Sequence, residues 1–263
     1  MDIKSSGVTA DALLQCWRSG EAMAVPLNGD KPALPEDGYA IQAELTRLLS
    51  GRIAGWKIAA TAEAGRRHIH VDSPLAGRLV ESMVAEDGAS VSLSGNRMRV
   101  AEAEIVLTLN SDLAPLERPR TELEVVNAVG TMHAGLELPD SRFDRFTEAG
   151  AACLIADNAC ARDFVLGNPV APPPDLRTLA DMKTALRINN QVVSTGYGRD
   201  AMGGSLIALT WLINTVNALG VTVRAGEFVT TGVTGAPVAV QPDDKLEVVI
   251  GKNIASVSAT LRD

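Results

Sequence analysis

Short strand-like runs separated by turn residues fill the chain from Ile53 to its end, and this pattern constrains the fold most strongly. Valine and isoleucine are dense in runs such as 228–233 and 245–250, and the Gly-Lys-Asn sequence at 251–253 is typical of a tight turn between strands. The most convincing helix of this region is 203–219, which carries apolar residues at helical spacing. Many strands and few helices predict a mixed, mainly β domain rather than a doubly wound one.

The first 52 residues have a different, helical character. Thr9 is a candidate N-cap for a helix over 9–24, with an apolar stripe on one face. A second amphipathic helix is predicted over 39–49, and Ser50-Gly51 would end it. The chain is therefore expected to divide into an N-terminal helical part, 1–52, and a β-rich domain, 53–263.

Two glutamates lie two residues apart in the strand-like run 99–107. Successive side chains of a strand point to opposite faces, so Glu102 and Glu104 would project together. A third acid, Glu137, lies in another apolar setting, 134–139. Neighbouring carboxylates repel unless a cation lies between them, and oxygen ligands suit a hard divalent cation such as Mg²⁺ or Mn²⁺. Taken alone, the Glu-x-Glu pattern also fits a solvated strand face.

Other charged residues lie in settings that are less informative. Lys57 interrupts the apolar strand 54–61, so its ammonium group must reach solvent or meet an anion. His68 and His70 have no third metal ligand nearby in the sequence, and we expect both at the surface. The run of small and apolar residues 151–156 is predicted to be a further strand.

Composition and charge exclude several classes of function. The net charge of −8 argues against a nucleic-acid partner or an anionic membrane surface, and aromatic residues at 3% provide few platforms for stacking bases. No apolar stretch is long enough for a membrane span, and no basic, apolar leader opens the chain. Cys16, Cys153 and Cys160 are odd in number and scattered, which predicts reduced thiols and a cytoplasmic protein.

A series of short motifs occurs in a specific order and spacing between Tyr39 and the C-terminus. These motifs are Tyr39-Ala40-Ile41-Gln42, Gly55-Trp56-Lys57-Ile58, Val71-Asp72-Ser73-Pro74, Ala101-Glu102-Ala103-Glu104-Ile105, Leu136-Glu137-Leu138-Pro139-Asp140-Ser141-Arg142, Ala156-Asp157-Asn158-Ala159, Met202-Gly203 with Trp211-Leu212-Ile213-Asn214, and Ala225-Gly226-Glu227-Phe228-Val229-Thr230-Thr231-Gly232. Together they resemble the 2-keto-4-pentenoate hydratase and 4-oxalocrotonate decarboxylase branch of the fumarylacetoacetate hydrolase superfamily. The resemblance implies an α+β fold: a compact, mixed β-roll like the C-terminal domain of fumarylacetoacetate hydrolase, with the N-terminal helices packed against it.

The same resemblance implies the parts of an active site. Glu102, Glu104 and Glu137 would be the ligands of Mg²⁺ or Mn²⁺, which agrees with the pattern of paired strand carboxylates. Lys57 matches the active-site lysine of the family. Thr231 and Gly232 would lie in the loop that faces the substrate, a small 2-oxo acid. Members of the family usually assemble, so we expect a homo-oligomer, or a complex with a homologous subunit.

Position 75 departs from the pattern of the hydratases. They carry an acidic residue in the segment where this chain has Pro74-Leu75-Ala76-Gly77, and a leucine cannot orient water or move protons. The first expectation remains a hydratase that adds water to 2-hydroxy-2,4-dienoates and gives 4-hydroxy-2-oxo acids in aromatic-compound catabolism. The second is a decarboxylase of a 4-oxalocrotonate-type diacid, since an apolar Leu75 beside a carboxylate favours loss of CO₂.

Two further interpretations of the function stay open at this point. Carbon–carbon bond hydrolysis ranks third, because no glutamate–histidine dyad stands out in the sequence. An inactive structural subunit of a hydratase or decarboxylase complex is the alternative from another class, although a scaffold would need neither the three acids nor Lys57. Asp72 is interpreted as a turn residue, and Arg78 is expected at the surface rather than against a second substrate carboxylate.

Overall fold

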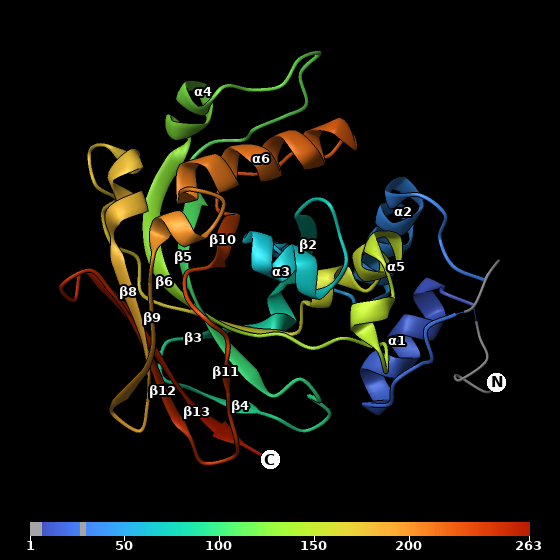
Figure 1. Ribbon diagram of the computed structural model, residues 1–263. Coiled ribbons are helices and arrows are strands. Elements are labelled where there is room, and N and C mark those ends of the chain that lie inside the picture. The colour runs from blue at the N-terminus through green and yellow to red at the C-terminus, as the bar shows by residue number, and fades with distance from the viewer. Residues whose placement is uncertain (1–6, 27–29) are drawn as a thin grey trace.

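Two β-sheets and six α-helices are present in the computed structural model, which describes residues 7–26 and 30–263 (Figure 1). The larger sheet has the strand order β2-β1-β10-β5-β6-β7-β3, and β11 pairs with β5 beside this path. Its strands are β1 (Ile53–Ala59), β2 (Leu75–Val80), β3 (Val84–Glu86), β5 (Val100–Leu109), β6 (Val129–Leu138), β7 (Asp163–Leu166), β10 (Phe228–Val233) and β11 (Val238–Ala239). The mainly β character predicted after residue 53 is confirmed.

The smaller sheet packs against the larger one across the main hydrophobic core. Its order is β4-β13-β12-β8-β9, with β4 (Ala89–Ser92), β8 (Lys183–Ile188), β9 (Gln191–Tyr197), β12 (Lys245–Ile250) and β13 (Ala255–Arg262). Strand β5 contributes alternate residues to this core, among them Ala103, Ile105 and Leu107. The intervening residues of β5 therefore face away from the core, because the side-chain period of a strand is two. This alternation places Glu102 and Glu104 on the opposite face of the sheet.

Helix α6 (Ser205–Ala218) completes the main core, and its position confirms the helix predicted there. In Figure 1 it lies across the top of the larger sheet, next to the short helix α4 (Glu122–Val126). Thr121 and Glu124 form the capping box that starts α4. The short helix α3 (Glu63–His68) connects β1 to β2, and none of its residues is buried.

The N-terminal helices build a second hydrophobic cluster with the middle of the chain. Helices α1 (Ala10–Ser19) and α2 (Pro35–Leu48) pack near α5 (Ala151–Ala156), as Figure 1 shows at the right of the molecule. The close approach of α2 to α5 requires a glycine, because a Cβ at Gly38 would lie 2.4 Å from the carbonyl oxygen of Ala152. The boundary predicted at residue 52 falls just before β1, yet the N-terminal helices share this cluster with residues of the β-rich part.

Two local predictions were wrong. Residues 151–156 form the helix α5 rather than a strand, because a six-residue apolar run has no periodicity that separates a strand from a buried helix. The first helix begins at Ala10 after the predicted Thr9 cap, but it ends at Ser19, not at residue 24. Gly20 adopts a left-handed conformation there, with φ of 73°, which ends the helix. Within the described residues, no helix has the length and apolar character needed to cross a membrane.

A buried ion pair links the loop after β6 to the end of α5. Arg142 and Asp157 are both almost completely buried and form a salt bridge, and Arg142 also lies 4.6 Å from the centre of the Trp17 ring. The hydroxyl of Ser141 donates to Asp157 Oδ2 at 2.6 Å, and Arg142 Nη1 donates to the carbonyl of Ala161 at 2.9 Å. Every charge in this network is therefore paired and hydrogen-bonded.

We expect the Arg142→Met variant to be strongly destabilised. Methionine keeps the length of the side chain but leaves the Asp157 carboxylate buried without its cation, which typically costs about 3–5 kcal/mol. Urea-induced unfolding of the metal-free proteins would measure the free energy of unfolding. The matched control is Arg47→Met, which removes the exposed partner of Glu44 and should leave the unfolding midpoint nearly unchanged. Equal midpoints for the two variants would contradict the structural role of the buried pair.

Candidate metal centre and active site

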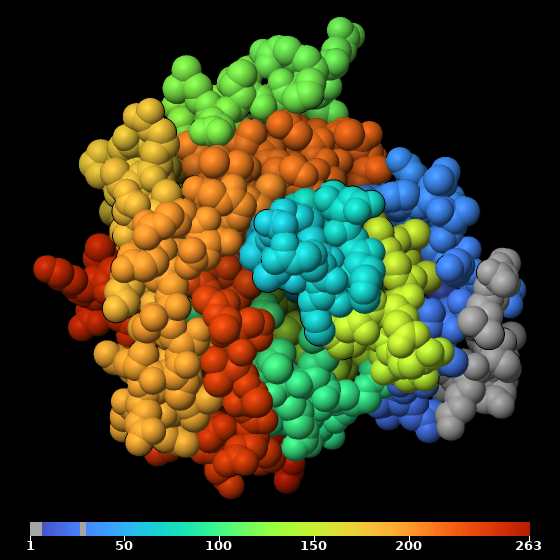
Figure 2. Space-filling view, in the orientation of Figure 1, coloured from blue at the N-terminus to red at the C-terminus, as the bar shows by residue number. Residues whose placement is uncertain are grey.

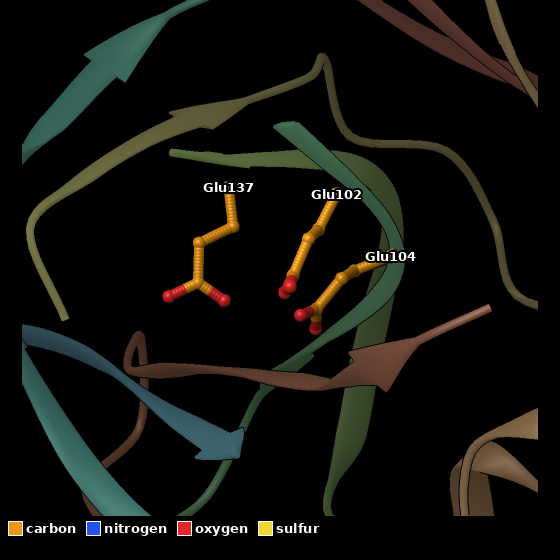
Figure 3. A group of neighbouring side chains, drawn as sticks. All are labelled: Glu102, Glu104 and Glu137. Atoms are coloured by element: carbon orange, nitrogen blue, oxygen red, sulfur yellow. The ribbon is translucent and has the colours of Figure 1, made fainter. Parts of the chain in front are cut away.

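The register of β5 and β6 brings three carboxylates together. Glu102 pairs directly with Glu137, so both side chains lie on the same face, and Glu104 lies on that face two residues further along β5. Figure 3 shows the three side chains projecting from their two strands toward a common space. One carboxylate oxygen from each residue lies within 4.8 Å of the other two. The clustering expected from the sequence is therefore present in the structure.

These carboxylates are costly to keep together without a cation. Glu104 and Glu137 are 1% exposed, and Glu102 is partly exposed. Burial, together with the charge of Glu137, raises the pKa of Glu102 to about 7. Burial and the charges of both neighbours raise the pKa of Glu104 well above its usual value. Like charges placed opposite each other destabilise a strand pair, so the arrangement is explained best if it serves a cation.

Strand β10 holds one oxygen of Glu104 in place. The backbone N–H of Gly232 donates to Glu104 Oε2 at 2.7 Å, and the hydroxyl of Thr230 donates to the same atom. The other oxygen of Glu104 remains available as a ligand. Such hydrogen bonds to a metal ligand fix its orientation and strengthen binding.

Thr230 was missed by the sequence analysis, which named its neighbour Thr231. The two adjacent threonines point to opposite faces of β10, and the pairing of Thr230 with Val106 places Thr230 on the face of Glu104. The hydroxyl of Thr231 instead donates to the carbonyl of Ile105 at 2.8 Å and to Ser205 Oγ at 3.2 Å. Thr231 and Gly232 therefore support the site through contacts within the protein, and their contact with substrate stays a prediction.

Lys57 joins the site from β1. Its Nζ atom lies 2.6 Å from Glu137 Oε1, and both side chains are almost completely buried. Burial alone would lower the pKa of Lys57, but the negative charges of Glu137 and Glu102 outweigh it and raise the pKa. Gly77 lies directly opposite Lys57 on β2, and a Cβ there would lie 2.9 Å from Lys57 Cγ. The glycine leaves space for the lysine side chain to cross β2.

Leu75 lies on the same face of the β1–β2 hairpin as Lys57, because Ala59 pairs with Leu75 and Lys57 pairs with Gly77. Leu75 is 1% exposed and belongs to the hydrophobic cluster beneath α1, α2 and α5. The residue is therefore an apolar neighbour of Lys57 on that face. Its contact with substrate stays a prediction.

Arg78 is buried, and the expectation of a surface residue was wrong. It lies on the opposite face of β2 from Leu75, with its guanidinium 5.2 Å from the centre of the Trp56 ring. Its Nη1 donates to Gln42 Oε1 at 2.7 Å. Helix α2, which carries Gln42, covers the arginine at this edge strand. The burial of Arg78 therefore depends on the tertiary structure.

The three histidines do not belong to the group of carboxylates. His68 and His70 are exposed, as predicted. His133 is on the strand of Glu137 but contacts Thr108, Thr131 and the carbonyl of Gly167 rather than the carboxylates. The three cysteines are free thiols. Asp72 lies in the bend before β2, as predicted.

Comparison with known proteins identifies the family to which this fold and site belong. Residues 59–262 match the family described as fumarylacetoacetate (FAA) hydrolase C-terminal. The chain belongs to the fumarylacetoacetate hydrolase family. The predicted family is thereby confirmed, and so is the α+β fold with a mixed β-roll and N-terminal helices.

Individual members of the fumarylacetoacetate hydrolase family resemble nearly the whole chain. It is 35% identical to a 2-keto-4-pentenoate hydratase of Paraburkholderia xenovorans (strain LB400), covering 90% of this chain and 88% of that protein. It is 32% identical to a 4-oxalocrotonate decarboxylase of Pseudomonas putida, covering 85% and 84%. The structure of the 4-oxalocrotonate decarboxylase from Pseudomonas putida G7, complexed with magnesium and adipate, matches with a TM-score of 0.85 at 26% identity, covering 96% and 95%.

Proposed function

We propose that this protein is a divalent-cation-dependent lyase of 2-oxo acids, and that it hydrates 2-hydroxy-2,4-dienoates to 4-hydroxy-2-oxo acids. The observation that carries the proposal is the buried group of three carboxylates and one ammonium, Glu102, Glu104, Glu137 and Lys57. The names of two relatives support the reaction. A 2-keto-4-pentenoate hydratase aligns with 90% of the chain, and a 2-hydroxyhexa-2,4-dienoate hydratase aligns with 94% of it.

Glu102, Glu104 and Glu137 would hold the cation, Mg²⁺ or Mn²⁺. Glu137 is buried, with its Oε1 2.6 Å from the Lys57 ammonium and its Oε2 without a hydrogen-bond partner among the described residues, and Glu104 has one oxygen oriented by β10, so the donor set fits a hard cation. When bound, the cation supplies Lewis acidity to the carboxylate and 2-oxo oxygens of a chelating substrate. The related structure complexed with magnesium supports a divalent cation in this family.

Lys57 would supply the mobile proton. Its ammonium group is buried beside the carboxylates, so it can donate a proton to the substrate carbon skeleton and recover one from the enol hydroxyl, which makes ketonisation a net transfer of a proton from oxygen to carbon. The same ammonium group can balance the charge of the substrate carboxylate. The protein around it excludes bulk water, since Lys57 is 2% exposed. Water then adds to the conjugated enone that ketonisation produces.

Decarboxylation of a 4-oxalocrotonate-type diacid is the second candidate function. The observation that favours it is Leu75, which is buried on the same hairpin face as Lys57 and cannot orient water. An apolar wall destabilises a carboxylate that loses its charge as CO₂ leaves. The structural likeness to a 4-oxalocrotonate decarboxylase also supports it.

A product assay separates the two functions. We expect the purified protein with Mg²⁺ or Mn²⁺ to convert 2-hydroxypenta-2,4-dienoate to a product heavier by one water, as measured by ultraviolet absorbance and mass spectrometry. Release of CO₂ from the diacid, with no change in the dienoate, would instead assign the decarboxylase. If neither substrate changed, the alternative from another class, an inactive structural subunit, would be preferred.

The inactive-subunit interpretation predicts that the protein does not bind Mg²⁺ at the three glutamates, because a scaffold has no need of a cation. Isothermal titration of the protein with Mg²⁺ tests this without any substrate. Assembly into a homo-oligomer, or into a complex with a homologous subunit, and the cytoplasmic location remain predictions. The state of assembly can be measured by light scattering.

A further inference from the structure

Thr61 keeps a buried hydroxyl group without a hydrogen bond. Among the buried side chains of residues 7–26 and 30–263, six atoms lack such a partner: Thr61 Oγ1, Arg120 Nε, Glu137 Oε1 and Oε2, Arg162 Nε and Asn217 Oδ1. Arg120, Arg162 and Asn217 make hydrogen bonds through their other polar atoms. Glu137 is ion-paired with Lys57 through Oε1 and is a proposed metal ligand, so Thr61 is the one residue of this group whose side chain has no polar partner.

The other buried threonines in the described part of the chain show how unusual this is. Each of them donates its hydroxyl proton to an acceptor inside the protein: Thr46 to Gln42, Thr184 to Thr234, Thr230 to Glu104, Thr231 to Ile105 and Thr234 to Ala103. A buried hydroxyl without a partner loses its hydration and gains nothing in return, which destabilises the fold. A group retained at such a cost has a reason that the folded chain alone does not provide.

Thr61 lies beside the candidate metal centre. A Cβ at Gly232 would lie 2.4 Å from Thr61 Oγ1, and the N–H of the same glycine donates to Glu104. Thr61 also follows β1, the strand that carries Lys57. The hydroxyl therefore adjoins the Glu104 side of the site, whereas Lys57 occupies the Glu137 side.

The local backbone is held so that Thr61 stays in this position. Ala60 adopts a left-handed conformation with φ of 58°, which is unfavourable for a residue with a side chain. Arg66 of α3 donates to the carbonyl oxygens of Ala60 and Thr61 at 3.2 and 3.0 Å. The space-filling view shows that α3 lies on the molecular surface next to the segment after β10 (Figure 2). A strained turn and an unpaired hydroxyl thus occur together beside the site.

We propose that Thr61 Oγ1 donates a hydrogen bond to the carboxylate of a 2-oxo acid bound at the three glutamates. A carboxylate accepts hydrogen bonds, and Thr61 offers the free buried hydroxyl donor next to Glu104. Lys57 and Thr61 then bind the ligand from two sides. The inference rests on the proposed function only in taking a chelating 2-oxo acid as the ligand.

The Thr61→Val variant tests this, because valine has the shape of threonine without the hydroxyl. Oxalate serves as the probe, since its two adjoining carboxylates offer the chelating geometry of a 2-oxo acid. Calorimetric titration into the Mg²⁺-loaded protein should show oxalate binding weakened about 10- to 100-fold in the variant, with Mg²⁺ binding unchanged. The thermal midpoint of the metal-free variant should equal or exceed that of the wild type, because an unpaired polar group has been removed. Thr46→Val is the control for the same exchange far from the site, and it should bind oxalate like the wild type.

Two outcomes would overturn the inference. One is wild-type affinity of Thr61→Val for oxalate, and the other is a parallel loss of Mg²⁺ binding, which would make Thr61 a support of the metal ligands. If valine prevents folding, Thr61→Ser and Thr61→Ala replace it: serine should keep the affinity and alanine should lose it, and equal affinities would reject the role. A wild-type protein that bound no oxalate at all would count against the proposed function and against this inference together, whereas a normal wild type with an unaffected variant rejects only the inference.

Discussion

Replacing Glu104 with glutamine is expected to remove catalysis and most of the metal affinity. Glutamine has the same shape, and its amide oxygen can still accept the hydrogen bonds from Gly232 and Thr230. The variant therefore loses one of the three negative charges of the proposed metal ligands and keeps the shape and hydrogen bonds of the side chain. We expect kcat/KM to fall about 10³-fold and the dissociation constant of Mg²⁺ to rise at least about 100-fold.

The stability of the same variant provides an independent readout. In the metal-free protein, Glu104→Gln relieves repulsion between buried carboxylates, so its thermal midpoint should be no lower than that of the wild type. Addition of Mg²⁺ should raise the midpoint of the wild type but not that of the variant, because a ligand stabilises only the protein that binds it.

Glu247→Gln is the matched control for the same chemical change on a strand. Glu247 pairs with Arg187 on the smaller sheet, and both side chains are more than a third exposed. We expect this control to keep both its Mg²⁺ response and its activity. A Glu104→Gln variant that bound Mg²⁺ normally and kept full activity would reject the assignment of the metal centre.

Replacing Lys57 with methionine is expected to separate proton transfer from metal binding. Methionine fills the same buried space but has no charge and no proton to donate. We expect kcat to fall about 10²- to 10⁴-fold, the range typical of a general acid or base. Mg²⁺ binding should be preserved or strengthened, because Glu137 loses its competing ion pair with Lys57.

The metal-free Lys57→Met protein should also be less stable than the wild type. The buried Glu137 carboxylate is left without its cation, and Mg²⁺ should restore the thermal midpoint by taking that place. Lys245→Met, at an exposed position of β12, controls for the loss of a lysine charge. A loss of Mg²⁺ affinity in Lys57→Met, rather than a loss of kcat alone, would contradict the role assigned to the lysine.

The local sequence was sufficient for most elements and for the group of acids. The alternation of β5 predicted that Glu102 and Glu104 share a face, and the register with β6 then added Glu137. The family motifs predicted the fold, which the comparisons confirm. Where the local pattern was ambiguous, as in the short apolar run that forms α5, the prediction failed because a periodicity cannot be measured over six residues.

The sequence alone therefore determined the mainly β domain after residue 53, the helices before it and the grouping of the three acids. Only the tertiary structure decided that Thr230 rather than Thr231 supports Glu104, that Lys57 pairs with Glu137, and that the Thr61 hydroxyl has no hydrogen-bond partner among the described residues. The reason is physical: side-chain alternation is a local property of each strand. Strand register, burial and hydrogen-bond partners depend on residues far apart in the chain, such as β1 against β2 or β10 against β5.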